Sequence, residues 1–226
     1  MNKENAKHIL AGNFEQLLSL NETQRMIRNL GFQQYTFSIG RCEQLEEVLN
    51  LVSETYAARN ALTLLFRVTP HRLAYLMKPF LSKLVKLGKC FIAMEKETDK
   101  IVASLCLEDH YDNIQAAVTW NKQRGEILIN EQHQFELLAI VHKLAHYQLE
   151  STAAEQHGKL YHCTFAAKRQ SQSAEKGLFS FLLYLALRTV NAHIWTDSTD
   201  PAQTRLFVNT FHAELLQNVD FSEHIF

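Results

Sequence analysis

The chain has 226 residues, of which 46% are hydrophobic and 21% are charged, with only 7 Gly and 3 Pro. These values are typical of one large globular domain, and they exclude a disordered, collagen-like or low-complexity chain. Since 23 Lys and Arg stand against 24 Asp and Glu and no block of like charges occurs, a nucleic-acid-binding protein is disfavoured.

The cysteines and the first residues indicate the compartment. The four cysteines are widely spaced without a C-x-x-C pair: Cys42, Cys90, Cys106 and Cys163. Each lies in an apolar stretch, where a thiol behaves as a small buried hydrophobe, so we expect a reducing compartment. Residues 1–5 are polar and lead into no signal-peptide core, and no run of about 18 apolar residues follows. We therefore expect a cytoplasmic protein that does not contact a membrane.

The first part of the chain is predicted to form short helices. Asn21 and Gln24 resemble a capping box, an apolar stripe follows, and Gly31 ends the helix. We predict that residues 1–34 are a helical extension of a single domain, residues 35–226. The apolar side chains of this extension would either pack on the domain or form a dimer: Phe14, Leu17 and Leu18.

The next segments are predicted to form a strand followed by two helices. Polar and apolar residues alternate over residues 35–39, which is typical of a strand, and apolar residues then recur at helical spacing over residues 45–56. Thr69 followed by Pro70 is a strong helix start, because the first helical turn leaves the N–H that proline lacks unpaired anyway. We expect this second helix to continue to residue 87 with a kink at Pro79.

A hairpin and an alternating order of elements follow. Two β-rich runs, residues 91–94 and 101–107, are joined by a charged turn and predict an antiparallel hairpin. The later predictions, in chain order, are a strand near Val118 and Trp120, an amphipathic helix over 131–151, a strand over 160–167, a helix over 175–190, a strand over 193–197, a helix over 201–210 and a strand within 214–226. This order indicates a mixed α/β fold whose last alternation requires a parallel crossover.

Residues 161–167, 175–183 and 199–207 carry a resemblance to a known family. They are similar to the central strand, the following helix and the next helix of the GCN5-related N-acetyltransferase superfamily, in particular its arylalkylamine branch. The resemblance covers roughly residues 35–226. It implies a mostly antiparallel mixed central sheet with flanking helices, and acetyl-CoA as co-substrate.

The loop before the helix of residues 175–190 would hold the coenzyme A diphosphate. Unpaired N–H groups and the dipole at a helix N-terminus attract phosphates without particular side chains. The family pattern is Arg or Gln, two residues, Gly, one residue, then Gly or Ala. One register matches it only at Gly177, and another begins at Gln172, has Glu175 in place of the first glycine and ends at Gly177.

Several charged residues surround this loop. In the first helical turn, Glu175 would repel a diphosphate, and Lys168, Arg169 and Lys176 would offset that repulsion. The alternative is that Glu175 is only a good first-turn residue of a buried helix that binds no cofactor. The residues that the resemblance assigns to the cofactor are Phe165, Ala166, Ala167, Gln172, Ser173, Ala174, Glu175, Lys176, Gly177, Leu178, Thr204 and Phe207.

Acetyl transfer needs an acid for the leaving thiolate and a base for the acceptor ammonium. The family often supplies the acid as a tyrosine where this chain has Phe207, which cannot donate a proton. The remaining hydroxyl candidates are Ser198, Thr199 and Thr204. Water is another candidate for this role, because coenzyme A thiolate is a good leaving group.

Two acidic regions are candidates for the base. The arylalkylamine branch uses an acidic residue of its first helix, and Glu54 is the nearest match. The second region, Glu108 to Asp112, follows the predicted hairpin and contains His110, whose intrinsic pKa of about 6.5 suits a base. The alternative for this second region is a solvated loop of polar residues.

Three further patterns have simpler explanations. His142 and His146 have the spacing of zinc ligands, but Lys143 replaces the glutamate of the H-E-x-x-H motif, so we expect no metal. Three lysines at a spacing of three residues are typical of a solvated helix face, with an anion site as the alternative: Lys83, Lys86 and Lys89. Five aromatic residues at helical spacing indicate core positions rather than a cofactor box: Tyr75, Phe80, Phe179, Phe181 and Tyr184.

The sequence favours an N-acetyltransferase that transfers acetyl directly from acetyl-CoA within a ternary complex. The acceptor would be a small-molecule amine or an exposed protein amino group, and a homodimer is compatible with the chain. The alternative is a degenerate module that binds acyl-CoA or a protein partner without transfer, which Phe207 and the incomplete glycine motif favour. A third interpretation is an interaction scaffold that binds no ligand.

Overall fold

The computed structural model describes residues 3–65, 67–109, 160–169, 177–196 and 201–213. The chain forms two compact units. The first contains residues 1–108 and 163–194, and the second contains residues 109–162 and 195–226. Three predictions lie outside the described residues: the strand near Val118, the helix over 131–151 and the strand within 214–226. Within the described part of the chain, every helix is too short or too polar to cross a membrane.

A five-stranded sheet forms the centre, in the order β1-β2-β3-β4-β5. Its strands are β1 (Tyr35–Ile39), β2 (Cys90–Glu95), β3 (Ile101–Asp109), β4 (Leu160–Lys168) and β5 (His193–Trp195). The pairs β1–β2 and β2–β3 are antiparallel, with Tyr35 opposite Glu95 and Cys90 opposite Cys106. The predicted hairpin is therefore confirmed, and so are the strands predicted over residues 35–39, 160–167 and 193–197.

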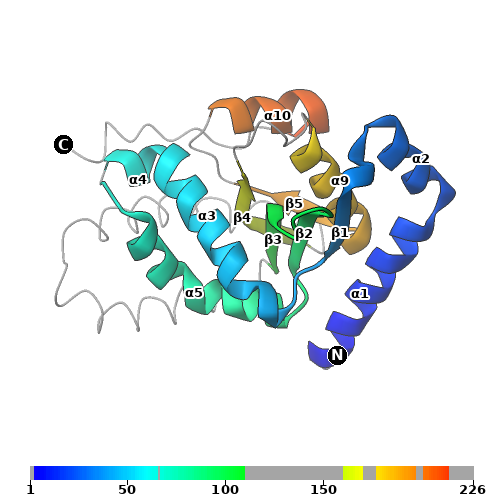
Figure 1. The fold of residues 1–226 in the computed structure, drawn as a ribbon, viewed down its shortest axis with the longest axis horizontal. Helices are drawn as coiled ribbons and strands as arrows, with labels where there is room; N and C mark the ends of the chain where they lie inside the picture. Colours follow the sequence, from blue (N-terminus) through cyan, green and yellow to red (C-terminus); the bar gives the residue numbers. More distant parts are fainter. Residues whose placement is uncertain (1–2, 66, 110–159, 170–176, 197–200, 214–226) are drawn as a thin grey trace. The chain divides into compact units, whose positions relative to one another are not determined.

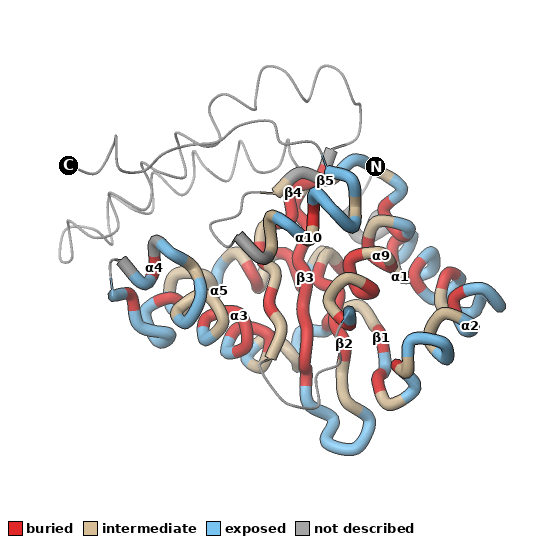
Figure 2. The backbone as a smooth tube through the Cα atoms, turned by 90° about the horizontal axis from the view of Figure 1, so that it is seen from above, coloured by how far each residue is buried: buried red, intermediate tan, exposed pale blue. Residues whose placement is uncertain are grey.

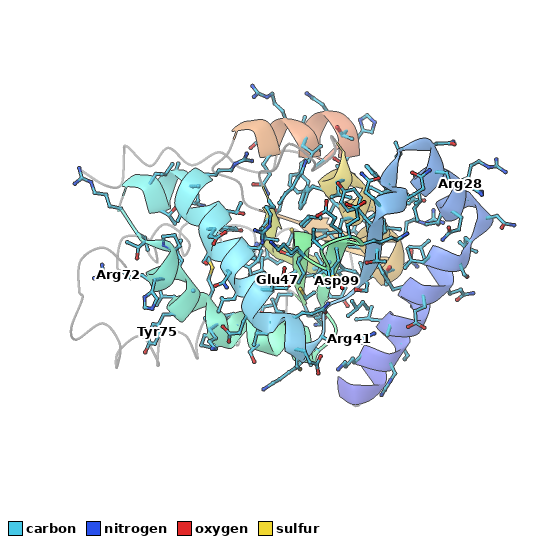
Figure 3. The ribbon with its side chains drawn as sticks, viewed as in Figure 1. Arg28, Arg41, Glu47, Arg72, Tyr75 and Asp99 are labelled. Carbon is cyan, nitrogen blue, oxygen red and sulfur yellow. The ribbon has the colours of Figure 1, made fainter. Side chains whose placement is uncertain are left out.

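A bulge in the hairpin is tied to the helix above it. The register between β2 and β3 shifts at Ala93 and Met94, which frees a backbone donor. The Ile101 N–H donates to the Glu47 carboxylate at 2.7 Å. Figure 3 shows Glu47 reaching from α3 (Leu45–Arg59) toward the strands, with Asp99 in the hairpin turn. This carboxylate therefore fixes α3 against the sheet.

Two pairs of helices cover the two faces of this sheet within the first unit. Helix α3 lies beside α5 (Pro70–Lys86) on one face, and α1 (Lys3–Ser19) lies beside α9 (Leu178–Val190) on the other (Figure 1). Because side chains alternate along a strand, Cys90 and Ile92 join the core under α3 and α5, whereas the Phe91 ring meets Phe14 of α1. Strands β2 and β3 are consequently buried along most of their length (Figure 2).

The N-terminal helices pack on this unit. Helix α1 and α2 (Asn21–Asn29) agree with the predicted helices. The Phe14 side chain is only 1% exposed and its ring centroid lies 5.5 Å from that of Phe91. Leu17 is buried as well. Of the two predicted roles for these side chains, packing on the domain is the one observed.

The short elements and α5 follow their local sequence. The short helices are η1 (Phe32–Gln34), η2 (Cys42–Gln44) and α4 (Ala61–Leu65). Thr69 caps α5, and its hydroxyl accepts from the Arg72 N–H at 3.4 Å, while Pro70 occupies the first turn as predicted. Helix α5 continues through Pro79 to Lys86. In the second unit, α10 (Pro201–Phe211) confirms the predicted helix.

The structure corrects two predictions about individual positions. Helix α9 begins at Leu178 rather than at residue 175, because Gly177 adopts φ 95° and forms its N-cap. Cys42 is exposed, contrary to the prediction that all the cysteines are buried, whereas the other three are buried. Cys42 lies in η2, where the chain passes over the surface between β1 and α3.

Candidate functional site

The C-terminal half of β4 is held against α3. The Tyr56 hydroxyl donates to the Thr164 carbonyl at 3.3 Å, and the Tyr56 ring packs on Phe165 with centroids 6.2 Å apart. Phe165 and Ala167 belong to the core under α3 and α5, and Ala166 between them is part-buried. The backbone of residues 165–167, predicted to pair with the pantetheine arm, therefore lies on a rigid strand.

The N-terminus of α9 has the properties of an anion site. Among the described residues no side chain caps Gly177, and the first turn carries no acidic residue. Since the Phe181 N–H makes the first helical bond, to the Gly177 carbonyl at 2.9 Å, the N–H groups of residues 178–180 have no partner within the helix. The prediction that Glu175 occupies the first turn is wrong, because the helix begins after it.

Gly177 has little around its Cβ position in the described part of the chain. Among those residues, a Cβ atom at this position would meet only the Phe32 Cζ, at 3.9 Å. Glycine is required here by its positive φ rather than by crowding. Leu178, the next residue, is fully buried. Of the residues assigned to the loop, only these two are described, and Gln172, Ser173, Ala174, Glu175 and Lys176 lie outside the described residues.

Cationic side chains gather where β4 ends. Lys168 is the last residue of the strand, and the Arg169 N–H continues the pairing by donating to the Val102 carbonyl at 2.8 Å. The Arg169 Nε atom is buried without a hydrogen-bond partner. Burial lowers the pKa of Lys168 from its ordinary value, and the Arg59 charge lowers it further. Positive charge is therefore concentrated beside the predicted phosphate loop.

Glu108 is a buried carboxylate rather than part of a solvated loop. It lies within β3 and its residue is 4% exposed. The Lys83 Nζ of α5 approaches its Oε1 at 3.5 Å. The alternative of a solvated polar loop is therefore wrong for Glu108, and Lys83 is not simply a solvated lysine. His110, the other residue predicted in this region, lies outside the described residues.

Glu54 and Glu108 lie in different surroundings. Glu54 is exposed on α3, whereas Glu108 is buried in β3. Ser198 and Thr199 lie outside the described residues. Thr204 and Phe207 lie on α10 in the second unit, where Phe207 is 8% exposed and packs on Phe211 with centroids 6.3 Å apart. Phe207 is thus a packed residue of its own helix.

The aromatic residues divide between core and surface. Phe181 is buried and packs against Phe32, Phe37 and Tyr184, which confirms the core interpretation for Phe181. Phe179 and Tyr184 are part-buried. Tyr75, by contrast, is 64% exposed on α5 (Figure 3), so the core prediction is wrong for this residue.

No cluster of His, Cys, Asp or Glu in the described ranges can hold a metal ion. His142 and His146, the pair with zinc-like spacing, lie outside these ranges.

Two residues of this region were not identified from the sequence as parts of a site. Tyr56 and Arg59 interact with residues of β4, which is far away in the chain. Arg59 sits in the last turn of α3, a position that is ordinary for a cation. Only the helical spacing of residues 56 and 59, which places both on one face of α3, was a usable signal.

Comparison with known proteins identifies the fold. No family model and no curated protein matches the chain. Among solved structures it is similar to the Drosophila melanogaster polyamine N-acetyltransferase, with a TM-score of 0.66, 15% identity and coverage of 84% of this chain and 88% of that one. It is also similar to an agmatine N-acetyltransferase, with a TM-score of 0.65, 16% identity and coverage of 85% and 88%.

A third similar structure is named as a condensation domain rather than as an N-acetyltransferase. This is the C-terminal condensation domain of Ebony in complex with beta-alanyl-dopamine, with a TM-score of 0.63, 13% identity and coverage of 85% and 88%. These likenesses show that the chain has the mixed α/β fold of the GCN5-related N-acetyltransferases, as its element order predicted.

Proposed function

We propose that this protein is an acetyl-CoA-dependent N-acetyltransferase that acts on a small amine or an exposed amino group. The observation that carries the proposal is the arrangement at the end of β4, where the uncapped N-terminus of α9 and a group of cations belong to one compact unit of this fold. An enzyme of this kind needs a site for a diphosphate next to a strand that binds an extended arm.

The residues present fit acetyl-CoA. The buried Arg169 Nε has no partner in the described part of the chain, and the N–H groups at the start of α9 have none within the helix. Both are donors that a diphosphate would satisfy. The backbone of residues 165–167 would pair with the pantetheine arm, as the resemblance implies. Thr204 and Phe207 of α10 are assigned to the thiol end on the same basis.

Direct transfer forms an amide bond between the acceptor nitrogen and the acetyl carbon, and it breaks the thioester to release coenzyme A as a thiol. The acceptor ammonium loses two protons, one before the attack and one as the amide forms. One of these protons goes to the thiolate sulfur and the other is released to solvent. Glu54, Glu108 and His110 are the proposed bases. The Lys83 Nζ lies 3.5 Å from the Glu108 Oε1.

Ser198, Thr199 and Thr204 are the proposed hydroxyl donors to the thiolate, with water as the alternative. Because Phe207 has no proton to give, positioning of the acceptor nitrogen against the thioester would supply much of the rate.

The acceptor is proposed to be a small cationic amine. The enzymes with which the fold is shared are named for agmatine, polyamines and arylalkylamines, all of which are protonated near neutral pH. A carboxylate such as Glu54 or Glu108 would attract such a cation before it accepts the proton. The three buried free thiols support a reducing compartment, and we propose the cytoplasm.

Thermal unfolding with increasing acetyl-CoA tests cofactor binding. At 100 times the dissociation constant a ligand adds about 2.7 kcal/mol, and for a chain of this size each kcal/mol raises the midpoint by about 2–4 °C. Coenzyme A should give a similar increase and adenosine none. A panel of agmatine, polyamines and arylalkylamines, followed by thiol release, then tests transfer. An unchanged midpoint at saturating acetyl-CoA would contradict the proposal.

Phe207 favours a second candidate, a module that binds acyl-CoA or a protein partner without transfer. A rise in the midpoint without thiol release from any amine would support this candidate over the enzyme. The substitution Phe207→Tyr separates the two further, because thiol release that begins only in this variant would mean that the parent lacks the acid.

A further inference from the structure

We propose that Tyr56 is the acid of the reaction, and that its phenol gives a proton to the coenzyme A sulfur as the thioester breaks. This inference rests on the proposed function and goes beyond it, because it assigns a new residue to the reaction. Phe207, at the position where the family often has a tyrosine, has no proton to give. Tyr56 would supply the proton from a different element of the fold, α3.

The Tyr56 hydroxyl lies at the edge of β4 that faces β5. Along a strand, the N–H and C=O groups of one residue point to the same neighbouring strand, and successive residues alternate between the two neighbours. The Arg169 N–H donates to the Val102 carbonyl of β3 at 2.8 Å, so the backbone groups of residues 164, 166 and 168 point away from β3. The strand on that other side of β4 is β5. The Thr164 carbonyl accepts from the Tyr56 hydroxyl at 3.3 Å, and it therefore lies on the β5 edge.

The pantetheine arm would extend along this same edge. Of residues 165–167, which are proposed to pair with the arm, Ala166 presents its N–H and C=O groups toward β5. The alternation is regular here, since Phe165 and Ala167 share the core under α3 and α5 whereas Ala166 is part-buried. With the diphosphate between the end of β4 and the start of α9, the arm runs back along the strand toward Thr164. Its thiol end would therefore reach the Tyr56 hydroxyl.

The position of this phenol is fixed by contacts of its ring and of its backbone. The Tyr56 ring packs on Phe165 with centroids 6.2 Å apart. The Tyr56 carbonyl accepts from the hydroxyl of Thr63, a buried residue of α4, and from the Asn60 N–H that ends α3. A proton donor held in this way needs little reorganisation when the reaction occurs.

The hydrogen bond to Thr164 can be exchanged for one to the sulfur. At 3.3 Å it is longer than the usual hydroxyl bond of about 2.5–3.0 Å, so little is lost when it breaks. As the carbon–sulfur bond breaks, its electron pair goes to the sulfur, and Tyr56 gives its proton to that atom. The phenolate regains a proton from the acceptor nitrogen by way of the base or water. The other proton of the ammonium goes to solvent, so the products are the amide, the thiol and one proton.

The test is the rate of acetyl transfer in a single turnover with saturating acetyl-CoA, measured as a function of pH. One variant is Tyr56→Phe, which removes only the phenolic oxygen, and in a second protein 3,5-difluorotyrosine, a more acidic phenol, replaces Tyr56. Tyr75→Phe is the matched control, since Tyr75 is 64% exposed on α5 and has no part in the proposed site. Calorimetry of coenzyme A binding and urea unfolding show whether a variant still binds and folds.

We expect Tyr56→Phe to slow transfer by about 100-fold, the low end of the range for general acid catalysis because the thiolate is a good leaving group. Its affinity for coenzyme A should stay close to that of the parent. The rate of the parent should fall at high pH, where a phenol of ordinary pKa about 10 loses its proton. Difluorotyrosine should move this fall to lower pH, Tyr56→Phe should abolish it, and Tyr75→Phe should leave rate and pH profile unchanged.

The outcomes separate this inference from the proposed function. A parent that releases no thiol with any amine overturns the proposed function and the role of Tyr56 with it. An active parent whose Tyr56→Phe variant transfers equally fast overturns the acid alone and leaves the function standing. A slower variant that keeps the fall at high pH, or a fall that fluorination does not move, shows that the contact with Thr164 is structural. That result also overturns the acid.

Discussion

Lys168 is a lysine whose protonation depends on its surroundings. Its pKa lies below the ordinary value of 10.5 because burial and the Arg59 charge both disfavour the ammonium. Between the folded pKa and 10.5 the unfolded chain binds more protons than the folded one, so this group contributes stability that rises with pH through that window. A bound anion has the opposite effect on the side chain.

We expect coenzyme A binding to take up protons at Lys168. A diphosphate favours the ammonium, so the pKa of Lys168 should rise on binding and affinity should fall as pH increases through the unliganded pKa. Calorimetry at about pH 9 in two buffers of different ionisation enthalpy measures this uptake. The Lys168→Arg variant, which stays charged, should lack it. Equal uptake in both proteins would show that another group titrates.

Gly177→Ala should destabilise the protein through its backbone. At φ 95° an alanine is strained, and the described residues leave room for its Cβ atom. We expect a loss of about 1–2 kcal/mol in the free energy of unfolding, measured with urea. Gly12→Ala is the matched control, since Gly12 lies inside α1 with nothing near its Cβ position, and it should stabilise by about 0.5–1 kcal/mol. Equal effects of the two substitutions would contradict this account.

At the scale of elements, an ion pair between Lys83 and Glu108 joins helix α5 to strand β3 of the hairpin. Glu108 has a side chain that is 5% exposed, whereas the Lys83 side chain is 38% exposed. The cost of separating them is therefore asymmetric. A lone lysine at this position can reach water, and a lone carboxylate cannot.

We expect Lys83→Met to destabilise the protein more than Glu108→Gln does. Lys83→Met removes one cation from the surroundings of the buried carboxylate and should cost about 1–3 kcal/mol, a range reduced from that of fully buried pairs because solvent screens the exposed lysine. Glu108→Gln removes the charge and should cost less. Urea unfolding of both variants and of the double variant measures the order. The reverse order would mean that the further interactions of Glu108 contribute more to stability than its contact with Lys83 does.

Helix α1 is an integral layer of its unit. Phe14→Ala should cost about 3–5 kcal/mol, because it leaves a cavity against Phe91. Ile9→Ala, on an exposed position of the same helix, should change stability by less than about 0.5 kcal/mol. Urea unfolding compares the two. A small effect of Phe14→Ala would show that α1 contributes little to the core.

The local sequence pattern predicted most of the helices and strands, but it did not predict the contacts between distant segments. Alternation and the Thr69–Pro70 start were sufficient for β1, the hairpin and α5, because both signals act within a few residues. The start of α9 was misplaced because Glu175 is a good first-turn residue, while only the backbone shows that Gly177 has a positive φ and precedes the helix. The contact of Glu108 with Lys83 and the proximity of Arg59 to Lys168 depend on how helices cross the sheet, which periodicity does not specify.

At the scale of the molecule, one unit contains a sheet covered on both faces, and the proposed cofactor residues of β4 and α9 belong to it. The fold was predictable because the order of elements is itself a signature, even though identity to the solved structures is only 13–16%. The acceptor amine could not be predicted, because the sequence pattern does not specify the positions of the loops that would select it. The fold therefore does not by itself specify the substrate.

Because Cys42 is exposed and the other three cysteines are buried, a thiol reagent can label the protein at one site. Burial and a hydrogen bond with the Cys90 thiol, the larger cause, raise the pKa of Cys106 well above 9.0, whereas Cys42 is exposed in η2. A maleimide dye added to the native protein should therefore modify Cys42 alone, and mass spectrometry should find one label per chain. A fluorophore at this position would report unfolding without any engineered cysteine.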